Sequence, residues 1–405
     1  MQRKLLTNGN VFPRTDGRWN GVIRYMDEDG TTKRKSFCGK TKSDVKKKIR
    51  DYIVTFNEDI NDAVVSNKQL EVAMQEWLEV FKFPSVRRVT YDRCEQVLKN
   101  QIKPYLGDKI LSNITSTDIK KTITELTEKG YAFSTVKKAY NLLNQFFSYL
   151  SIEGYLVKNP MINVAMPKKV TFLSSQGKEF KPTCETVTIF TPEEIEKINT
   201  EAYCKYPTGT PKHELPGVYT LMLNTGLRTG EMLGLRNCDI DLNNKVLYVR
   251  QAVKECDKRD GAKKVGGKEL VIGEPKSKTS IRMVPLNATA IEKIKEIREE
   301  RYFGEEAPLV ADEHGNYTLP DNLRKRFIRV QDQAGVEKKG LHALRHTFAT
   351  TLINGIKQPD GSIKSLSVRQ VADILGHTTS EVTEMYYVKK DTSRLVGMTD
   401  GFELK

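Results

Sequence analysis

Several features that would mark a membrane, metal-dependent or nucleotide-dependent protein are missing from this sequence. No apolar run approaches the roughly 20 residues of a transmembrane helix, and Met1-Gln2-Arg3-Lys4 leads into no signal-peptide core. The sequence has no phosphate-binding P-loop, and no acidic cluster suggests magnesium chemistry. We therefore expect a cytoplasmic protein with no membrane partner and no cofactor.

Cysteines are few and scattered, and none forms a C-x-x-C pair, which disfavours structural zinc and fits reduced thiols. The six are Cys38, Cys94, Cys184, Cys204, Cys238 and Cys256. His342 and His346 stand four apart, a spacing that can hold zinc. The residues between them supply no acid, however, and Arg345 would repel a cation. We predict no metal site.

Positive charge is what the sequence has in excess. With 66 Lys and Arg against 52 Asp and Glu, the formal net charge is +14. This excess favours a polyanionic partner, and nucleic acid over a membrane, although a basic protein can also lack any such partner. The length of 405 residues suggests two or three domains with buried cores.

The segment 341–387 contains the residues around which the chain is organised. Its first part repeats apolar residues at helical spacing, so we predict an amphipathic helix. His342 and Arg345 share one flank of that helix. An imidazole and a guanidinium side by side suit an anion, most naturally a phosphate.

Two further motifs flank this helix in the sequence. After it, Gly376 ends an apolar segment, His377 follows, and a tyrosine pair begins nine residues later at 386–387. Before it, in the run 224–235, Arg228 stands just ahead of a predicted helix N-terminus at Thr229. This run resembles a family motif, named below, in which a helix ends at glycine and the arginine lies in the turn before the next helix.

Taken in order, these motifs resemble the signature of the tyrosine recombinases, also called the phage integrase family. The resemblance is close in the C-terminal half and by pattern only elsewhere. It implies that a tyrosine attacks a DNA phosphodiester, forms a 3′-phosphotyrosine and releases a 5′-hydroxyl. Because the bond energy is conserved in this exchange, rejoining needs no ATP.

The resemblance also implies a role for each motif residue. Arg228 and Arg345 neutralise the phosphate oxygens and hold the pentacoordinate transition state. His342 and His377 donate hydrogen bonds to the phosphate or help to deprotonate the nucleophile. Tyr386 is the predicted nucleophile, from its spacing to His377.

Alternatives remain open at two of these positions. The family carries a catalytic lysine in a hairpin turn, and Lys276 is our choice, with Lys278 as a rival. Tyr387 is the rival of Tyr386, because spacing within the family varies by one residue. We interpret His346 and His314 as structural histidines.

Residues 1–60 are predicted to form a small domain of two strands and a helix. It resembles the arm-type DNA-binding domain found ahead of many integrases, although the basic sheet face could simply be solvated. Residues 57–66 are predicted to be a polar linker. The basic candidates in the small domain are Arg14, Arg18, Arg24, Lys33, Arg34 and Lys35.

Residues 67–168 are predicted to be a helical domain, similar to the SAM-like core-binding domain of the family, which clamps DNA through phosphates. One helix is expected at 117–129, capped by Thr117. Another helix is expected at 134–152, with an apolar stripe. Aromatic stripes in this block are interpreted as core rather than base-stacking surfaces. Candidate phosphate contacts, each alternatively a solvated charge, are Arg87, Arg88, Lys99, Lys103, Lys137 and Lys138.

Residues 168–190 are predicted to be a hinge, and 188–390 an α+β catalytic domain that opens with a helix capped by Thr191. Strands at 269–272 and 281–286 are expected to form the hairpin that carries the lysine. By resemblance, the tail 391–405 docks on a neighbouring subunit; alternatively it is a frayed terminus.

The sequence thus predicts a multidomain, mainly α-helical protein with small β-sheets, acting as the site-specific recombinase of a phage or conjugative transposon. By resemblance, it works through a Holliday junction as a homotetramer on double-stranded DNA with core and arm sites, together with excision or DNA-bending helper proteins. We expect it in the bacterial cytoplasm, associated with the nucleoid. The alternatives are a type IB topoisomerase-like enzyme and a DNA-binding regulatory or architectural protein without catalysis.

Overall fold

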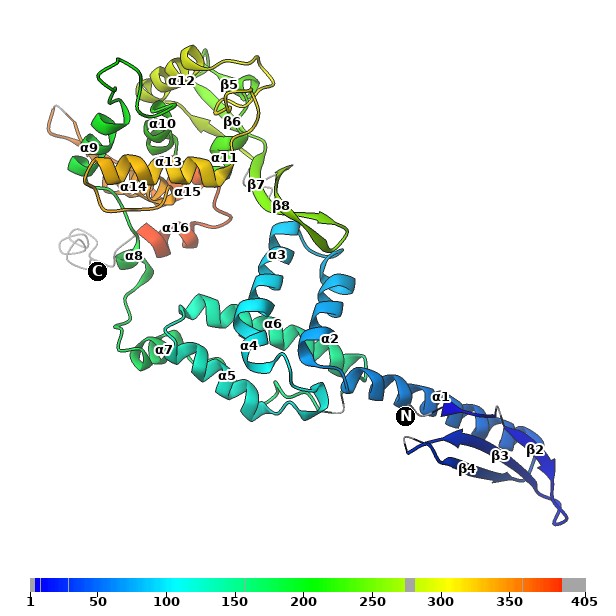
Figure 1. The fold of residues 1–405 in the computed structure, drawn as a ribbon. Helices are drawn as coiled ribbons and strands as arrows, with labels where there is room; N and C mark the ends of the chain where they lie inside the picture. Colours follow the sequence, from blue (N-terminus) through cyan, green and yellow to red (C-terminus); the bar gives the residue numbers. More distant parts are fainter. Residues whose placement is uncertain are drawn as a thin grey trace, which may run out of the picture. The chain divides into compact units, whose positions relative to one another are not determined.

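The computed structural model describes residues 4–7, 9–27, 29–156, 158–273, 281–358 and 360–387. The chain divides into two compact units, Met1–Phe180 and Lys181–Lys405, and it is mainly helical with small sheets, as predicted (Figure 1). Within the described ranges, no helix combines the length and apolar character needed to cross a membrane.

The first unit begins with an antiparallel sheet on which a helix packs. The order is β1-β3-β2, with β4 on the free edge of β3. Ile23 from the sheet is buried against Val45 and Ile49 of the helix. The elements are β1 (Lys4–Leu5), β2 (Asn10–Pro13), β3 (Trp19–Met26), β4 (Thr32–Gly39) and α1 (Lys42–Ser66).

The predicted linker at 57–66 is wrong, because α1 runs without a break to Ser66. Its composition misled the prediction: Asn57, Glu58, Asp59 and Asn61 are polar. Polar residues are nevertheless compatible with a helix.

The rest of the first unit is helical. The stripe predicted on α6 is core, and its Phe146 and Phe147 are fully buried. α5 is capped by Thr115 in a capping box with Asp118, not by Thr117 as predicted. The elements are α2 (Leu70–Trp77), η1 (Leu78–Lys82), α3 (Arg88–Val97), η2 (Leu98–Ile102), α4 (Lys103–Leu106), η3 (Leu111–Asn113), α5 (Ser116–Glu128), α6 (Phe133–Ile152) and α7 (Lys169–Ser175).

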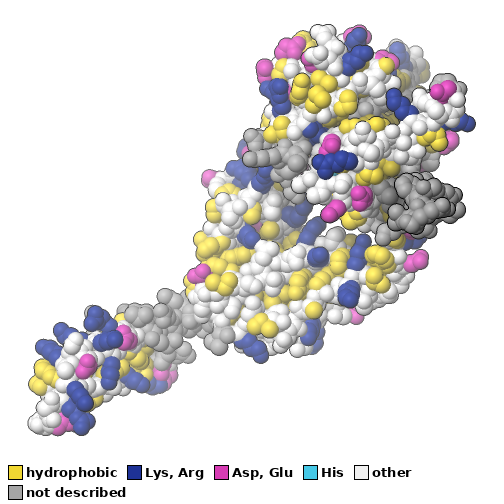
Figure 2. Space-filling model, turned by 180° about the vertical axis from the view of Figure 1, so that it is seen from behind, with side chains coloured by type: hydrophobic (Ala, Val, Ile, Leu, Met, Phe, Trp, Pro, Cys, Tyr) yellow, Lys and Arg dark blue, Asp and Glu magenta, His cyan; other side chains and the backbone are white. Residues whose placement is uncertain are grey.

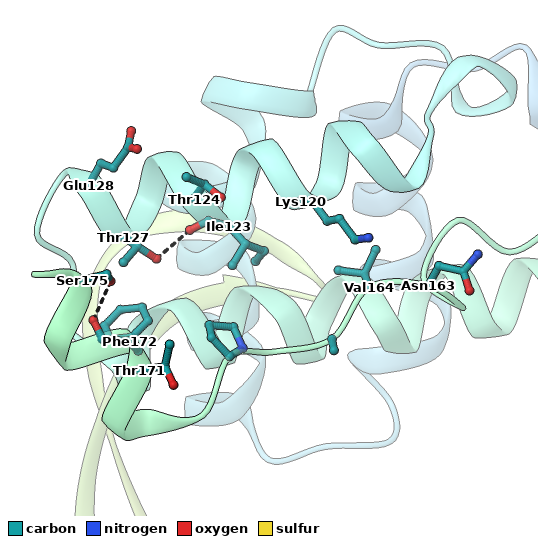
Figure 3. Close-up of a pocket in the computed structure, with 12 residues that line it drawn as sticks. Lys120, Ile123, Thr124, Thr127, Glu128, Asn163, Val164, Thr171, Phe172 and Ser175 are labelled. Atoms are coloured by element: carbon teal, nitrogen blue, oxygen red, sulfur yellow. Dashed lines mark hydrogen bonds between the residues drawn. The ribbon is translucent and has the colours of Figure 1, made fainter. Parts of the chain in front are cut away.

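The boundary between the units falls inside the predicted hinge, but this stretch is partly helical. Phe172 of α7 is buried and its ring contacts Phe133 with centroids 5.2 Å apart. Beyond α7, Gln176 donates 2.9 Å hydrogen bonds to the carbonyls of Thr127 and Tyr131. α7 therefore belongs to the first unit, and a groove of about 550 Å³ lies between it and α5 (Figure 3).

The second unit is a helical bundle with a three-stranded sheet of order β5-β6-β9 beside it (Figure 1). Its core joins α10, α13 and α14 to the sheet through buried residues such as Leu221, Phe327, Leu344, Leu247 and Val284. The bundle helices are α8 (Thr183–Thr186), α9 (Pro192–Ala202), α10 (Gly217–Thr225), α11 (Thr229–Gly234), η4 (Asn237–Asp239), α12 (Ala288–Glu300), α13 (Pro320–Gln333), α14 (His342–Asn354), α15 (Val368–Leu375) and α16 (Ser380–Tyr387).

The strands of this unit pair differently from the prediction. The segment 269–272 lies in β8, which pairs with β7, placing Glu255 opposite Leu270. β9 pairs instead with β6. The predicted hairpin of 269–272 with 281–286 is therefore wrong. The strands are β5 (Ile240–Asp241), β6 (Val246–Val249), β7 (Ala252–Asp260), β8 (Lys263–Gly273), β9 (Arg282–Pro285), β10 (Ile356–Lys357) and β11 (Ile363–Lys364).

Candidate active site

Arg228 lies in the turn between two helices of the second unit, as predicted. α10 ends at Gly226, whose backbone is left-handed with φ 63°, and α11 begins at Thr229. The Arg228 backbone N–H donates to Oε2 of Glu231 at 3.0 Å. Its Nη1 donates to Oε1 of the same carboxylate at 2.7 Å, so Glu231 orients the side chain of Arg228.

Glu231 is a buried carboxylate that three arginines approach. Arg282 of β9 donates to its two oxygens at 3.2 and 2.9 Å, and Nη1 of Arg345 lies 4.0 Å from Oε2. Burial alone would raise the pKa of Glu231, but the hydrogen bond and charge of Arg282, aided by Arg228, lower it to about 2. The carboxylate is therefore ionised at neutral pH and holds the arginines together.

Arg345 is buried, with a side chain only 1% exposed. Its Nη1 donates to the carbonyl of Gly226 and its Nη2 to the carbonyl of Leu375, both at 2.8 Å. Both carbonyls stand at helix C-termini, where backbone acceptors lack helical partners and a positive charge is favourable. Burial and the charge of Arg228 lower the pKa of Arg345 to about 9, so it stays charged at neutral pH.

His377 is held beside Arg345 by the end of α15. The helix ends at Gly376 with φ 68°, and Nε2 of His377 lies 3.1 Å from Nη2 of Arg345. A guanidinium only donates, so Nε2 accepts, and Nδ1 donates to Oγ1 of Thr383 at 2.7 Å. Burial and the charges of Arg345 and Arg228 lower the pKa of His377 to about 4, which makes the ring neutral.

His342 stands at the first position of α14, three residues before Arg345, on the helix that the sequence predicted. Protein atoms crowd its ring even though its side chain reaches solvent. This crowding, with the neighbouring His346 and Arg345, lowers the pKa of His342 to about 4. His342 is therefore a second neutral imidazole next to the arginines.

The two tyrosines have different surroundings. The Tyr387 side chain is buried, and its hydroxyl lies 2.6 Å from Nδ1 of His346. Burial raises the pKa of Tyr387 to about 12, although the charges of Arg345 and Arg228 act to lower it. Tyr386 is half-buried, and its ring stacks on His346 with centroids 5.8 Å apart.

The structure places six of the residues considered from the sequence in the second unit: Arg228, His342, Arg345, His377 and the tyrosine pair at 386–387. Two fixed positive charges, two neutral imidazoles and a phenol suit a phosphodiester, because the arginines can neutralise its oxygens and the phenol can attack. The predicted Lys276 and its rival Lys278 lie outside the described residues.

Three residues of this cluster were not among the predicted catalytic set. Glu231 follows Arg228 by three residues, a capping spacing that could have revealed it. Arg282 carries no such local signal, because its partners Glu231 and Ile374 are distant in sequence. His346 was interpreted as structural, and its contact with Tyr387 was not expected.

Comparison with known proteins identifies the family. The profile described as "Phage integrase family" matches residues 188–394, and the one described as "Phage integrase, N-terminal SAM-like domain" matches 70–127. A relative named "Tyrosine recombinase XerC-like", from Caldanaerobacter subterraneus subsp. tengcongensis, is 31% identical and covers 93% of this chain and 94% of its own length.

This chain is also similar to proteins of transposons. The transposase of transposon Tn916 from Enterococcus faecalis is 24% identical, covering 84% of this chain and 79% of its own length. The Tn1549 transposon integrase, solved with circular intermediate DNA, is 19% identical with a TM-score of 0.60, covering 82% of this chain and 99% of its own.

Lambda integrase, solved as a tetramer bound to a Holliday junction, shares the fold. It is 17% identical with a TM-score of 0.54, and the alignment covers 94% of this chain and 97% of that chain. With its family profile, its relatives and a fold shared with integrases, the chain belongs to the phage integrase family, the tyrosine recombinases.

Proposed function

We propose that this tyrosine recombinase integrates and excises a mobile element by cutting and rejoining DNA through a 3′-phosphotyrosine and a Holliday junction. The observation that carries the proposal is the cluster in which Arg228 and Arg345 approach Glu231, His377 lies beside Arg345, and the tyrosine pair contacts the next residue of α14, His346. This cluster provides the charge and the nucleophile that phosphodiester exchange requires.

The phosphate would be bound by the two arginines, with the neutral His342 and His377 beside them. A phosphate brings negative charge, which favours the protonated imidazole, so either ring can take up a proton or share one with the phosphate as charge develops. By resemblance, Lys276 protonates the departing 5′-oxygen. This assignment remains a prediction.

The nucleophile is one member of the tyrosine pair. Spacing from His377 favours Tyr386, the residue that the sequence predicts. The surroundings of the Tyr387 hydroxyl favour Tyr387, because this hydroxyl is hydrogen-bonded to His346 and the charges of Arg345 and Arg228 act to lower its pKa. The two side chains follow one another on α16 and so point about 100° apart around the helix axis, which means that only one can face a given phosphate.

The N-terminal sheet supports a DNA-binding role for the first unit. Arg24 of β3 and Arg34 of β4 are exposed and lie directly opposite each other. Like charges at facing positions destabilise a sheet, and a bound polyanion would relieve their repulsion. The six predicted phosphate contacts of the helical block are also exposed. Figure 2 shows Lys and Arg side chains dispersed over the surface that it draws.

The family and the relatives support a proposal for the assembly. We propose a homotetramer on two double-stranded DNA sites in the bacterial cytoplasm, assisted by helper proteins that bend DNA or direct excision. The transposon relatives favour a transposon over a phage as the element. Residues 1–60, 67–168 and 188–390 would be the arm-binding, core-binding and catalytic domains, with 391–405 as a docking tail.

The proposal is tested by trapping on a nicked suicide substrate that carries an end of the element, in EDTA. We expect a covalent protein–DNA band in the wild type that one tyrosine-to-phenylalanine variant abolishes. Loss only in Tyr386→Phe assigns the nucleophile predicted by spacing, and loss only in Tyr387→Phe assigns the one favoured by its contacts. Tight DNA binding with no covalent band on any cognate end contradicts the proposed enzyme.

A further inference from the structure

His346 lies one residue beyond Arg345 on α14 and is outside the set of catalytic residues that the resemblance implies. Its Nδ1 is 2.6 Å from the Tyr387 hydroxyl, a short distance even for a strong hydrogen bond. The ring of His346 makes a T-shaped contact with that of His342, with centroids 4.5 Å apart, and it stacks on the ring of Tyr386. The imidazole is therefore fixed in position among groups of the active site.

The Tyr387 hydroxyl also lies within the electric field of the arginines that would hold the phosphate. Burial raises the pKa of Tyr387, and the charges of Arg345 and Arg228 oppose that rise. The ring is anchored in a small apolar cluster with Ala349, Val371 and Leu375. A hydroxyl that is anchored, bonded to an imidazole and close to two guanidinium groups is arranged as a nucleophile beside its base.

We propose that His346 holds the Tyr387 hydroxyl in its attacking position and accepts its proton as the hydroxyl attacks DNA. The inference rests on the proposed function and deepens it, because it assigns Tyr387 as the nucleophile. The oxygen–phosphorus bond forms, the bond from phosphorus to the 5′-oxygen breaks, and the tyrosine proton moves to Nδ1 of His346. A separate acid, by resemblance Lys276, supplies the proton of the released 5′-hydroxyl.

The charge of the surroundings suits this role. Burial and the charge of Arg345 lower the pKa of His346, so the ring is neutral at pH 7 and Nδ1 can accept the hydroxyl proton. Once the phosphate is bound, its negative charge offsets the arginines and makes proton uptake easier. General base assistance of this type is worth about 10²–10⁴-fold in rate.

The test compares two substrates that differ in one atom. Suicide DNA is made with either oxygen or sulfur as the 5′ leaving atom at the scissile phosphate. Because a thiolate leaves without being protonated, the sulfur substrate removes the need for the acid but not for the base. We therefore expect Lys276→Ala to be slow on the oxygen substrate and restored on the sulfur substrate.

His346→Phe keeps a ring for packing but cannot accept a proton. We expect it to form the covalent complex at least about 100-fold more slowly than wild type on both substrates, with unchanged DNA affinity. His346→Asn keeps an acceptor near the place of Nδ1 without its basicity, so its rate should fall between wild type and His346→Phe. His314→Phe, at a histidine that is 74% exposed, should behave as wild type.

Several outcomes overturn the inference. If His346→Phe forms the covalent complex within threefold of the wild-type rate, His346 has no role in the reaction. If the sulfur substrate restores the rate of His346→Phe, His346 acts on the leaving group and not on the tyrosine. If His346→Asn reacts as fast as wild type, His346 does not accept the tyrosine proton. If His346→Phe fails to fold, the Asn variant alone decides.

The proposed function can survive this failure. If wild type and Tyr387→Phe both form the covalent complex and Tyr386→Phe does not, the roles assigned to His346 and Tyr387 are wrong, but the proposed recombinase activity stands. The absence of any band in the wild type removes both.

Discussion

Glu231 links the arginines of the active site without touching the substrate in the proposed reaction. Its carboxylate is hydrogen-bonded to Arg228 and Arg282 and lies near Arg345. Without this carboxylate, three neighbouring guanidinium groups would repel one another, and two of them, those of Arg282 and Arg345, are buried. The geometry of the phosphate site therefore depends on one negative charge.

This charge also ties stability to pH. The folded-state pKa of Glu231 is about 2, below its ordinary value of 4.5. The stabilisation is therefore fully present above pH 4.5 and is lost as the pH falls toward 2. The difference corresponds to about 3 kcal/mol.

We predict that Glu231→Gln lowers the free energy of unfolding by about 3 kcal/mol at pH 7, because an amide cannot balance the buried guanidinium groups. The loss should shrink as the pH is lowered from 5 to 3, because the unfolded wild type takes up a proton at Glu231 below pH 4.5 while the folded protein stays ionised there down to about pH 2. Denaturant titrations at several pH values measure both effects, and covalent trapping should show a slower reaction.

The control is Glu313→Gln, which removes a carboxylate whose side chain is 79% exposed. It should leave stability and trapping unchanged within about 0.5 kcal/mol. Equal stability of Glu231→Gln and wild type at pH 7 would falsify the structural role assigned to this carboxylate.

The positions of the candidate catalytic residues were predictable where the motif was local. Arg228 follows a glycine in a run that resembles the family's arginine motif, and His342 and Arg345 share a helical flank. The contacts of Arg282 and His346 were not predictable, because their partners lie 51 and 41 residues away in the sequence. No local pattern reports which distant segments meet.

At the scale of elements, the turn between α10 and α11 determines how Arg345 is held. The Gly226 carbonyl accepts a hydrogen bond from Arg345. A Cβ at this residue would lie 2.4 Å from Cδ1 of Phe348, and φ is positive. Both the close approach and the backbone conformation therefore require glycine.

We predict that Gly226→Ala destabilises the protein by more than the roughly 1–2 kcal/mol of left-handed backbone strain alone, because Phe348 must also move. It should slow covalent trapping as well, since the acceptor of Arg345 is displaced. Thermal unfolding should show a midpoint lowered by at least about 4 °C, at about 2–4 °C per kcal/mol for a unit of this size.

Gly209→Ala separates the two causes. Gly209 also has a positive φ, of 84°, but a Cβ there meets no atom within 4 Å. This variant should show the backbone cost only and should trap DNA at the wild-type rate. If both variants lose equal stability, steric contact with Phe348 is irrelevant.

Elements with a strong apolar period were predictable, such as α6, and so was the Thr191 cap of α9, where the capping box forms. The predictions from the sequence failed for strands that are rich in charged residues. β7 contains Lys254, Glu255, Asp257 and Lys258, so it lacks the alternation that predicts a strand, and β8 was assigned to the wrong partner. Pairing over long distances depends on packing, which local pattern does not contain.

At the scale of the whole molecule, the net charge of +14 lies mainly in the first unit, where 31 Lys and Arg against 20 Asp and Glu give +11, while 35 against 32 give +3 in the second unit. Figure 2 shows Lys and Arg side chains dispersed over the surface that it draws. Affinity for DNA should therefore come from many phosphate contacts and depend on salt. The paired arginines of the N-terminal sheet allow one part of that charge to be tested separately.

We predict that Arg24→Gln combined with Arg34→Gln weakens binding to arm-type DNA and reduces the slope of log affinity against log salt by about 2. The variant should be at least as stable as wild type, because two facing like charges are removed. Salt titrations of binding and thermal unfolding measure the two effects.

Trapping on a core-site suicide substrate is the control, and it should be unaffected. An unchanged salt slope would show that this sheet face does not bind DNA phosphates.

The position of α16 along the chain has a consequence for synthesis. A ribosome completes the first unit about 200 residues before it reaches Tyr386 and Tyr387, and at bacterial elongation rates of about 5–20 residues per second this is about 10–40 s. During that interval, the nascent chain holds the part proposed to grip DNA but has no nucleophile. Because α16 carries both tyrosines, a polypeptide released before α16 is synthesised could bind a chromosomal site but could not cleave the DNA there.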